Sequence, residues 1–281
     1  MAGSFSNSWA LVKASANVLR LDKELMVFPL LSGVATVLVL ASFVAPLALT
    51  GGWQSIGGDG QDPSYLAYVL GFLFYLIQYT VIFFFNSALV GAALIRLDGG
   101  DPSVSDGLSI AFGRLPAILG YAAVAATVGM ILRAISERSG IVGRIVMGLV
   151  GMAWTLATYL AVPVLVTKNV GPIDAVKESA QLFRRTWGEQ VVGNFGMGWA
   201  IALMLVSWTL VSAGLVALGA QFAPTGVFVA LALAVAGYVF LALLSSALKG
   251  IYTAALYRYA STGDAGGFDA GIVGHAFRPR R

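Results

Sequence analysis

The chain has 281 residues, of which 58% are hydrophobic and 11% charged, and its mean hydropathy is +0.85. Soluble domains carry about 25% charged residues, so this composition excludes a soluble globular protein and predicts a chain that lies in a bilayer. The net charge of +4 does not indicate nucleic-acid binding, because the basic residues flank apolar runs and form no patch interleaved with aromatic residues. With no cysteine, the chain has no disulfide, thiolate nucleophile or thiolate metal site.

Six apolar runs without a charged residue follow one another along the chain: residues 26–50, 65–95, 115–132, 145–167, 190–222 and 224–248. Most of them reach about 20 residues, the length that an α-helix needs to cross a hydrocarbon core. They lack the alternation of apolar and polar residues that a membrane barrel requires. The sequence therefore predicts an all-α, polytopic membrane protein with six transmembrane helices.

The lengths of the first and third runs bear on whether each forms a span. The first run is about twice as long as the core of a signal peptide, so we expect it to be retained as a span. The third run is the shortest, and it can be extended if Arg133 directs its guanidinium towards the headgroups.

An amphipathic basic helix precedes the first and the fifth run. The octet Lys-Ala-Ser-Ala-Asn-Val-Leu-Arg at residues 13–20 returns as Lys-Glu-Ser-Ala-Gln-Leu-Phe-Arg at residues 177–184. The apolar stripes of the two copies coincide, because Trp9, Val12, Ala16 and Leu19 align with Ile173, Val176, Ala180 and Phe183. A degraded middle copy begins at residues 101–103, where a proline in the first helical turn resembles residues 171–173 and Ser109 matches Ser179.

These copies predict an internal repeat in which one interfacial helix is followed by two spans. The repeat units are residues 4–95, 97–167 and 168–259, within a single helical membrane domain of residues 1–260. Residues 261–281 are rich in glycine and are expected to form a flexible cytoplasmic tail.

The basic residues predict the orientation of the spans. If the six spans alternate in direction, fourteen of the 17 lysines and arginines lie on one side and only Arg133, Arg138 and Arg144 lie on the other. The positive-inside rule then predicts a multi-pass protein of the cytoplasmic membrane with both termini in the cytoplasm.

The repeated helices carry basic residues that could contact anionic lipid headgroups: Lys13, Arg20, Lys177, Arg184 and Arg185. The alternative is that these helices pack beneath the bundle and only connect the spans. A short helix that is tethered to a span needs no membrane affinity of its own, so this alternative stays open.

Four polar residues are candidates for an interior or interface site: Asn86, Arg133, Glu137 and Lys249. Asn86 lies beside phenylalanines in the second run and either bonds to a neighbouring helix or contacts a substrate. Arg133 and Glu137 are one turn apart and can pair; together with the two arginines that follow, they form either an external site for anionic lipid or a partner, or a hairpin stabilised by its charges. Lys249 either snorkels near the end of the last span or lines a path.

No catalytic, cofactor or metal site is predicted. The only histidine, His275, lies in the glycine-rich tail, and no acidic residue lies centrally in a span. The sequence therefore supports neither a histidine general base nor a pair of carboxylates within the bilayer.

Several stretches carry a resemblance to a known family: residues 22–25 with 28–31, 134–140, 171–175, 183–190 and 255–260. They resemble an uncharacterised family of prokaryotic six-span membrane proteins, a domain of unknown function, over nearly the whole chain. The resemblance implies the six-span fold and no activity. More distantly, a basic amphipathic helix before pairs of spans is similar to the membrane domain attached to some glycerophosphodiester phosphodiesterases, whose catalytic domain has no room here.

The first functional hypothesis is a non-enzymatic membrane protein with a structural, lipid-organising or partner-binding role. Its predicted partner is the lipid bilayer; the sequence identifies no protein partner, and it is compatible with a homo-oligomer. The alternative is a transporter or channel with a path between the repeat units, lined by Asn86, Arg133 or Lys249, although no span shows the paired interruptions of a broken-helix transporter. An enzyme acting on lipids is a third hypothesis, which lacks an acid–base pair.

Overall fold

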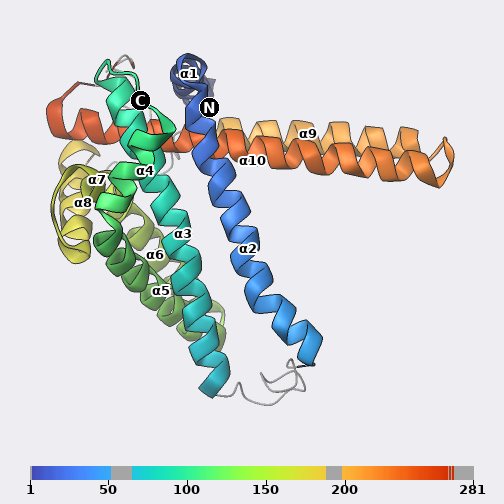
Figure 1. The fold of residues 1–281 in the computed structure, drawn as a ribbon, viewed down its shortest axis with the longest axis horizontal. Coiled ribbons are helices and arrows are strands. Elements are labelled where there is room, and N and C mark those ends of the chain that lie inside the picture. The colour runs from blue at the N-terminus through green and yellow to red at the C-terminus, as the bar shows by residue number, and fades with distance from the viewer. Residues whose placement is uncertain (1, 52–64, 188–197, 265, 267, 269–281) are drawn as a thin grey trace. The chain divides into compact units, whose positions relative to one another are not determined.

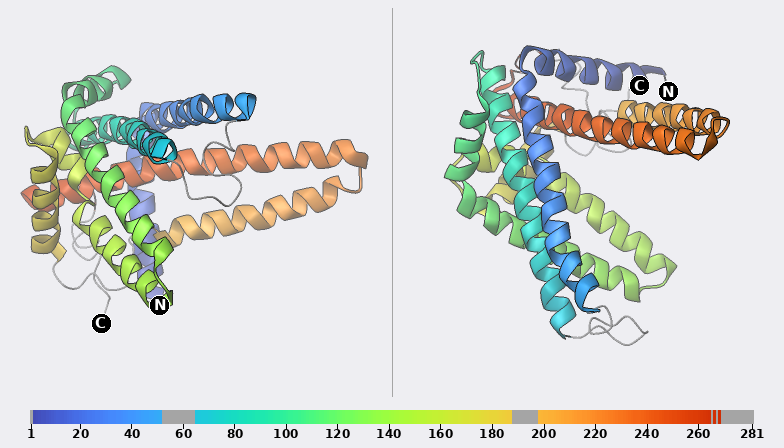
Figure 2. Two further views of the ribbon diagram at one scale, coloured as in Figure 1. Left: turned by 90° about the horizontal axis from the view of Figure 1, so that it is seen from below. Right: turned by 45° about the vertical axis from the view of Figure 1, so that its right-hand side comes forward.

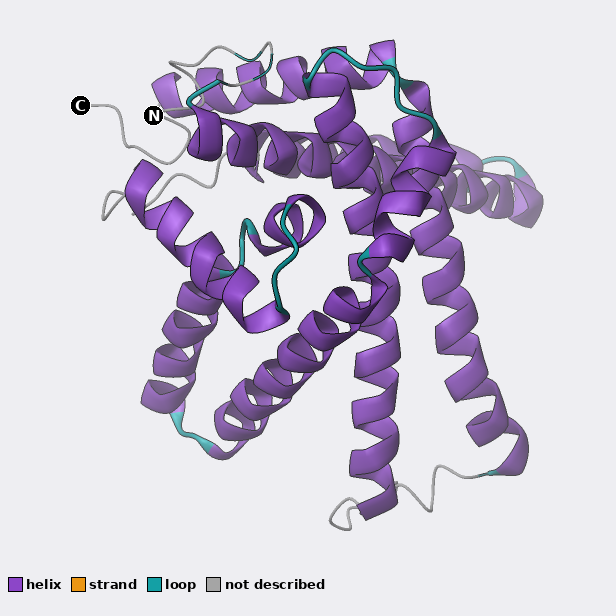
Figure 3. Ribbon diagram, turned by 60° about the vertical axis from the view of Figure 1, so that its left-hand side comes forward, coloured by secondary structure: helices purple, strands orange, loops and turns teal. Residues whose placement is uncertain are grey.

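The structure is a computed structural model that describes residues 2–51, 65–187, 198–264, 266 and 268, with only the backbone of residues 2–8, 187 and 223. Over these ranges the regular secondary structure is helical and contains no strand (Figure 3). The all-α class predicted from the continuous apolar runs is therefore confirmed.

The helices are, in chain order (Figure 1), α1 (Ala2–Leu21), the 3₁₀-helix η1 (Lys23–Met26), α2 (Val27–Thr50), α3 (Tyr65–Leu97), α4 (Val104–Gly113), α5 (Leu115–Arg138), α6 (Ile141–Ala157), α7 (Ala161–Thr167), α8 (Pro172–Trp187), α9 (Gly198–Gly219) and α10 (Ala223–Thr262). The shorter helices α1, α4 and α8 each precede two long apolar segments. This order follows the predicted plan of one helix and two spans, whereas the relation of the three groups as repeats stays a prediction.

Six helical segments of the described chain are long and apolar enough to cross a membrane: Lys23–Thr50, Tyr65–Leu97, Leu115–Arg138, Ile141–Thr167, Gly198–Gly219 and Pro224–Thr262. No more than 33% of the most apolar window of each segment is buried inside the protein. Large apolar side chains are instead exposed along the helices, among them Leu38, Leu210 and Phe228. Continuous apolar surface of this kind is stable against hydrocarbon and unfavourable in water, which makes the chain a polytopic membrane protein.

The fourth span is interrupted between α6, which ends at Ala157, and α7, which begins at Ala161. Pro163 gives the physical reason. It has no N–H for the carbonyl of Tyr159, four residues earlier, and its ring would clash with that carbonyl in a continuous helix. The fourth span, predicted as one continuous run over residues 145–167, therefore consists of two helices.

The last span is longer than its charge-free run. α10 has 40 residues and is therefore about 60 Å long, whereas the run ends at residue 248. A single charged residue does not end a helix, and both Lys249 and Arg258 lie inside α10. The end comes at Gly263, whose left-handed conformation (φ 80°) is free of strain only for glycine. Residues 261 and 262 thus belong to α10, and residues 269–281 of the predicted tail lie outside the described chain.

The starts of α4 and α8 differ in their chemistry. The Ser103 hydroxyl accepts the N–H of Asp106 at 3.2 Å, and the Asp106 carboxylate accepts the N–H of Ser103 at 2.8 Å, which forms a capping box. The Ser103 hydroxyl also donates to the Asp106 carboxylate at 2.7 Å, and this bond, together with the one from the Ser103 N–H, holds the pKa of the Asp106 carboxyl below its ordinary value. Pro102 consequently precedes α4 and does not occupy its first turn as predicted, whereas α8 does begin at Pro172.

The chain forms two compact units: residues 1–26, 93–101 and 184–281, and residues 27–92 and 102–183. In the first unit, α9 and α10 form a hairpin that α1 contacts (Figure 2). The Trp208 indole N–H donates to the carbonyl of Ala234 at 3.1 Å, and the hydroxyls of Thr209 and Tyr238 lie 2.8 Å apart. Gly237 faces the Trp208 indole so closely that a Cβ there would overlap the ring.

In the second unit, side chains of α2 contact α3, and α5 packs against α6. Phe43 and Phe74 meet edge to face with ring centroids 5.4 Å apart, and the Gln78 amide donates to the Thr36 hydroxyl at 3.0 Å. α4 approaches α3 at Gly107, where a Cβ would lie 2.7 Å from a backbone carbonyl oxygen of α3. Aromatic contacts, side-chain hydrogen bonds and small residues therefore hold these helices together, as is usual in membrane bundles.

Candidate functional site

The predicted pair of Arg133 and Glu137 is present on α5. Arg133 Nε donates to Glu137 Oε1 at 2.7 Å, and Arg133 Nη1 donates to the hydroxyl of Tyr75 on α3 at 3.0 Å. The side chains of Arg133 and Glu137 are 65% and 61% exposed. An ion pair this exposed contributes little to the free energy of unfolding, so neither side chain lines a buried path.

A series of aromatic rings follows one face of α3 from Tyr75. Tyr75, Tyr79 and Phe83 are spaced by four residues, and successive ring centroids lie 6.1 and 5.7 Å apart. Phe83 meets Tyr121 of α5 at 4.6 Å, and the buried Tyr121 shares a side-chain hydrogen bond with Thr158. The series joins α3, α5 and the interruption of the fourth span into one packed face.

Ser179 of α8 supports that interruption. Its hydroxyl accepts the backbone N–H of Leu160 at 2.9 Å, and both residues are fully buried. The contact satisfies a buried backbone donor at the start of α7. The ring centroids of Tyr159, in the interruption, and Phe183, in α8, lie 6.1 Å apart, so α8 contacts the interruption at a second point.

The two copies of the octet have the same pattern of burial. The buried residues of α1 include Leu11, Ser15 and Leu19, and those of α8 are Ala175, Ser179 and Phe183, so that Ser15 and Ser179 occupy equivalent positions. Trp9 and Ile173 open the predicted apolar stripes but are 51% and 58% exposed. The inward face of each helix is therefore rotated from the stripe towards the serine.

The middle copy follows this pattern less well. In α4 the buried residues are Gly107 and Ala111, whereas Ser109, which the sequence alignment matched with Ser179, is exposed. The buried faces of α4 and α8 correspond when the alignment is shifted by two residues. The predicted register of the middle copy is thus not the register of its buried face.

The five basic residues predicted to contact lipid are exposed: Lys13, Arg20, Lys177, Arg184 and Arg185. Lys177 lies 3.3 Å from Asp174, in an ion pair whose partners are both 67% exposed. Among the residues that the structure describes, Arg184 and Arg185 have no acidic partner within ion-pair distance. The helix α8 therefore presents two uncompensated guanidinium groups opposite its buried serine.

A second group of charges lies near the start of α8. The Arg114 guanidinium donates to the Asn169 side chain at 2.7 Å, and Lys168 pairs with Glu178. These contacts join the start of α5 to the segment between α7 and α8. They place α8 at the Arg114 end of the spans in this unit.

The first unit contains an ion-pair network that the sequence analysis did not identify. Arg96 Nε lies 3.3 Å from Asp22, and the same guanidinium pairs with Asp101. Asp22 is only 5% exposed, and its burial raises the pKa of the carboxyl above its ordinary value while Arg96 opposes that rise. The interaction explains how a carboxylate at the α1–η1 junction can be buried.

Arg258 extends this network to the end of α10. It pairs with Asp98 and lies 2.7 Å from Asp264, and its side chain is 19% exposed. Its Nε is buried and has no hydrogen-bond partner within the described chain. Phe268, beyond the end of α10, is buried, so the chain packs against the protein at this residue.

The other two predicted residues do not join these groups. Asn86 is half-buried in α3, next to the fully buried Ser87, and its predicted partner on another helix stays a prediction. Lys249 is exposed on α10, between the buried Leu248 and Gly250. Whether Lys249 snorkels or lines a path stays a prediction.

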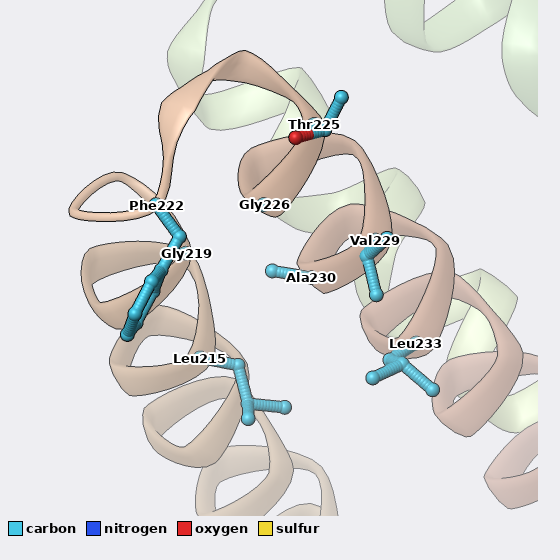
Figure 4. A pocket seen from close by; sticks show the side chains of 8 residues that line it. All are labelled: Leu215, Gly219, Phe222, Thr225, Gly226, Val229, Ala230 and Leu233. Atoms are coloured by element: carbon cyan, nitrogen blue, oxygen red, sulfur yellow. The ribbon is translucent and has the colours of Figure 1, made fainter.

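An open apolar hollow lies beside the turn between α9 and α10 (Figure 4). Leucine, valine, alanine, glycine and phenylalanine line it together with Thr225. Gly219 and Gly226 approach each other so closely that a Cβ on either would meet the carbonyl of the other. The hollow results from this tight turn, and its lining offers no charged group to a ligand.

The described residues contain no group of three or more histidine, cysteine, aspartate or glutamate side chains that could hold a metal ion. The apolar helices define the class as a polytopic α-helical membrane protein. The chain belongs to a family of unknown function (DUF6159), which it matches over residues 65–268, from α3 to beyond α10. No curated protein and no solved structure matches the chain.

Proposed function

We propose that this protein is a non-enzymatic membrane protein that binds anionic lipids through the basic faces of its amphipathic helices, above all α8. The observation that carries the proposal is that α8 is buried on one face and exposed on the other. One face buries Ala175, Ser179 and Phe183, while Arg184 and Arg185 are exposed without an acidic partner among the described residues. A helix fixed in this way holds its cations at a defined place beside the spans.

Membrane electrostatics supports lipid as the ligand. A basic side chain near an anionic membrane surface gains about 1 kcal/mol, and α8 lies at the Arg114 end of the spans, where Lys168 also occurs. The sequence pattern assigns most basic residues to the side of the membrane on which Arg114 lies. This excess supports the assignment of that side to the cytoplasm. A protein partner that binds the same face is the other outcome of the test.

The test replaces the three basic residues of this face, with the variant Lys177→Gln, Arg184→Gln, Arg185→Gln in the full chain. Native mass spectrometry of the purified protein, titrated with phosphatidylglycerol, should show about fivefold weaker binding for each charge removed. The matched control, Lys177→Arg with Arg184→Lys and Arg185→Lys, keeps the charge and should retain the lipid. Unchanged phosphatidylglycerol binding by the glutamine variant would contradict the proposal.

A transporter or channel is the second candidate, and one observation favours it. The fourth span is interrupted at residues 158–160, and interrupted helices often form the binding sites of transporters. Arg133 and Lys249, which this hypothesis placed along a path, are exposed. Flux of ions or metabolites into liposomes containing the protein, absent from protein-free liposomes, would support this candidate over the first.

The distant similarity to membrane domains of glycerophosphodiester phosphodiesterases adds no activity to the proposal. It concerns only the order of an amphipathic helix and two spans. Fold similarity does not transfer function without matching site residues.

A further inference from the structure

The turn between α5 and α6 combines exposed arginines with exposed aliphatic side chains. We call residues 131–145 the α5–α6 tip. Its three arginines and one glutamate give it a net charge of +2, and all four side chains are exposed. The exposed aliphatic residues around them are Ile131, Ile135, Ile141, Val142 and Ile145, of which Ile141 and Val142 are 71% and 75% exposed.

The tip lies one membrane thickness from the Arg114 end of the same unit. Arg114 precedes α5 directly, and Arg133 follows it by 19 residues on a continuous helix. At a rise of 1.5 Å per residue the two arginines are about 28 Å apart along the helix, close to the roughly 30 Å of a hydrocarbon core. When Arg114 lies in one headgroup region, Arg133 therefore reaches the other.

The surroundings of Arg133 suit that position. Its guanidinium is bound by the Tyr75 hydroxyl at 3.0 Å, and tyrosine is enriched where membrane meets water. Tyr65 and Tyr68, in the first turns of the same helix α3, are 85% and 51% exposed. Aliphatic side chains at this level can enter the acyl region while the arginines remain among the headgroups.

The charges at the tip are only partly compensated. Glu137 neutralises Arg133, whereas Arg138 and Arg144 have no acidic partner within ion-pair distance in the described part of the chain. A guanidinium can bind two phosphate oxygens at once, which makes arginine well suited to phospholipid headgroups. The mixture of free guanidinium groups and isoleucines fits an anionic lipid surface better than water or a neutral bilayer.

We propose that the α5–α6 tip binds the phosphate groups of anionic phospholipids in the leaflet opposite to the Arg114 end. This site shares no residue with α8, so the protein contacts anionic lipid at both ends of its spans. Glu137 limits the affinity of the tip for anionic lipid, because its carboxylate pairs with the guanidinium of Arg133, one of the three arginines.

The experiment uses the full chain and native mass spectrometry with phosphatidylglycerol or phosphatidylcholine as the titrant. The variant Arg138→Gln, Arg144→Gln should bind phosphatidylglycerol about fivefold more weakly for each charge removed, with a smaller loss for phosphatidylcholine, whose phosphate is balanced by its choline cation. Glu137→Gln should bind phosphatidylglycerol more tightly, because it frees Arg133. The charge-preserving variant Arg138→Lys, Arg144→Lys should retain most of the binding.

The opposite effects expected of two neutralising variants separate a lipid site from a structural hairpin. If the charges only stabilised the hairpin, Glu137→Gln would lower the melting temperature without tighter lipid binding. That result, or unchanged phosphatidylglycerol binding by the arginine variant, would overturn the proposal, as would an equal loss of both lipids. The glutamine variant of α8 should leave the effect of Glu137→Gln intact, so failure at α8 and failure at the tip are distinguishable.

Discussion

At the scale of single residues, Ser179 shows how a small polar side chain makes an interrupted span possible. A helix that stops inside a membrane protein leaves backbone donors without partners, and each such buried group is costly. The Ser179 hydroxyl accepts the N–H of Leu160 from another helix, so the interruption caused by Pro163 leaves this donor satisfied. The serine thereby connects an amphipathic helix to a span.

We expect Ser179→Ala to lower the free energy of unfolding by about 1–3 kcal/mol, because the Leu160 N–H would stay buried without its acceptor. Thermal unfolding in detergent, followed by circular dichroism, measures the effect. The control is Ser109→Ala, an exposed serine of α4 that should change the free energy by less than about 0.5 kcal/mol. Equal effects of the two substitutions would refute this role of Ser179.

The residue scale also shows what could be predicted from sequence. The spacing of four residues between Arg133 and Glu137 was sufficient to predict their ion pair, because both lie on one helix. The serine shared by the two octets was visible, but its bonding partner 19 residues upstream depends on the packing of the second unit. The pairing of Asp22 with Arg96, 74 residues apart, is likewise set by tertiary structure.

At the scale of helices, the capping box of α4 has a pH dependence of known sign. The pKa of Asp106 is lower in the folded protein than its ordinary value of 3.8, because Ser103 donates two hydrogen bonds to the carboxylate. The ionised carboxylate therefore stabilises the fold above pH 3.8. This contribution is lost as the pH falls through the lowered pKa.

We expect Asp106→Asn to be less stable than the unmodified protein near neutral pH, and the gap to close as the pH falls below 3.8. Melting temperatures measured between pH 3 and pH 7 would show this change. In a Ser103→Ala background, where the hydroxyl donor is absent, the effect of Asp106→Asn should shrink. A gap that stays constant over the whole pH range would contradict the capping role.

The α9–α10 hairpin depends on a close approach between two residues. The Trp208 indole occupies the space beside Gly237, so Gly237→Ala should displace the ring and break its hydrogen bond to Ala234. The expected cost is about 1–3 kcal/mol. Gly214→Ala in α9 is the control, since nothing lies within 4 Å of its Cβ position. Tryptophan fluorescence during thermal unfolding reports both, and equal melting temperatures for the two variants would disprove the contact.

Element boundaries were predictable where length and charge decide them. The charge-free runs located the six membrane-spanning segments, because a span requires about 20 apolar residues and polar groups mark its ends. The charge-free runs did not show that α10 continues to Thr262. Its later turns are stabilised by packing, because Ile251, Ala255 and Leu256 are buried against the rest of the protein. Packing against the protein can extend a helix beyond its hydrophobic run.

At the scale of the whole molecule, the placement of the spans in a membrane follows from charge. The tip carries three of the 17 basic residues, and the sequence pattern assigns the other fourteen to the opposite side. The positive-inside rule depends on such a bias in short segments near the ends of spans. It predicts that Gly140, at the tip, faces the outside and that Ser105, in α4, faces the cytoplasm.

The chain contains no cysteine, so single cysteines can report the side of each position without background. Gly140→Cys and Ser105→Cys place a thiol at exposed positions, and the extended backbone of Gly140 (φ −64°, ψ −175°) accepts any residue. A membrane-impermeant maleimide should label Gly140→Cys in intact cells and Ser105→Cys only after permeabilisation. The reverse pattern would invert the topology and place α8 outside, and labelling of both in intact cells would mean that the two positions share a side. The first pattern is expected because moving fourteen cations across the membrane is much less favourable than moving three.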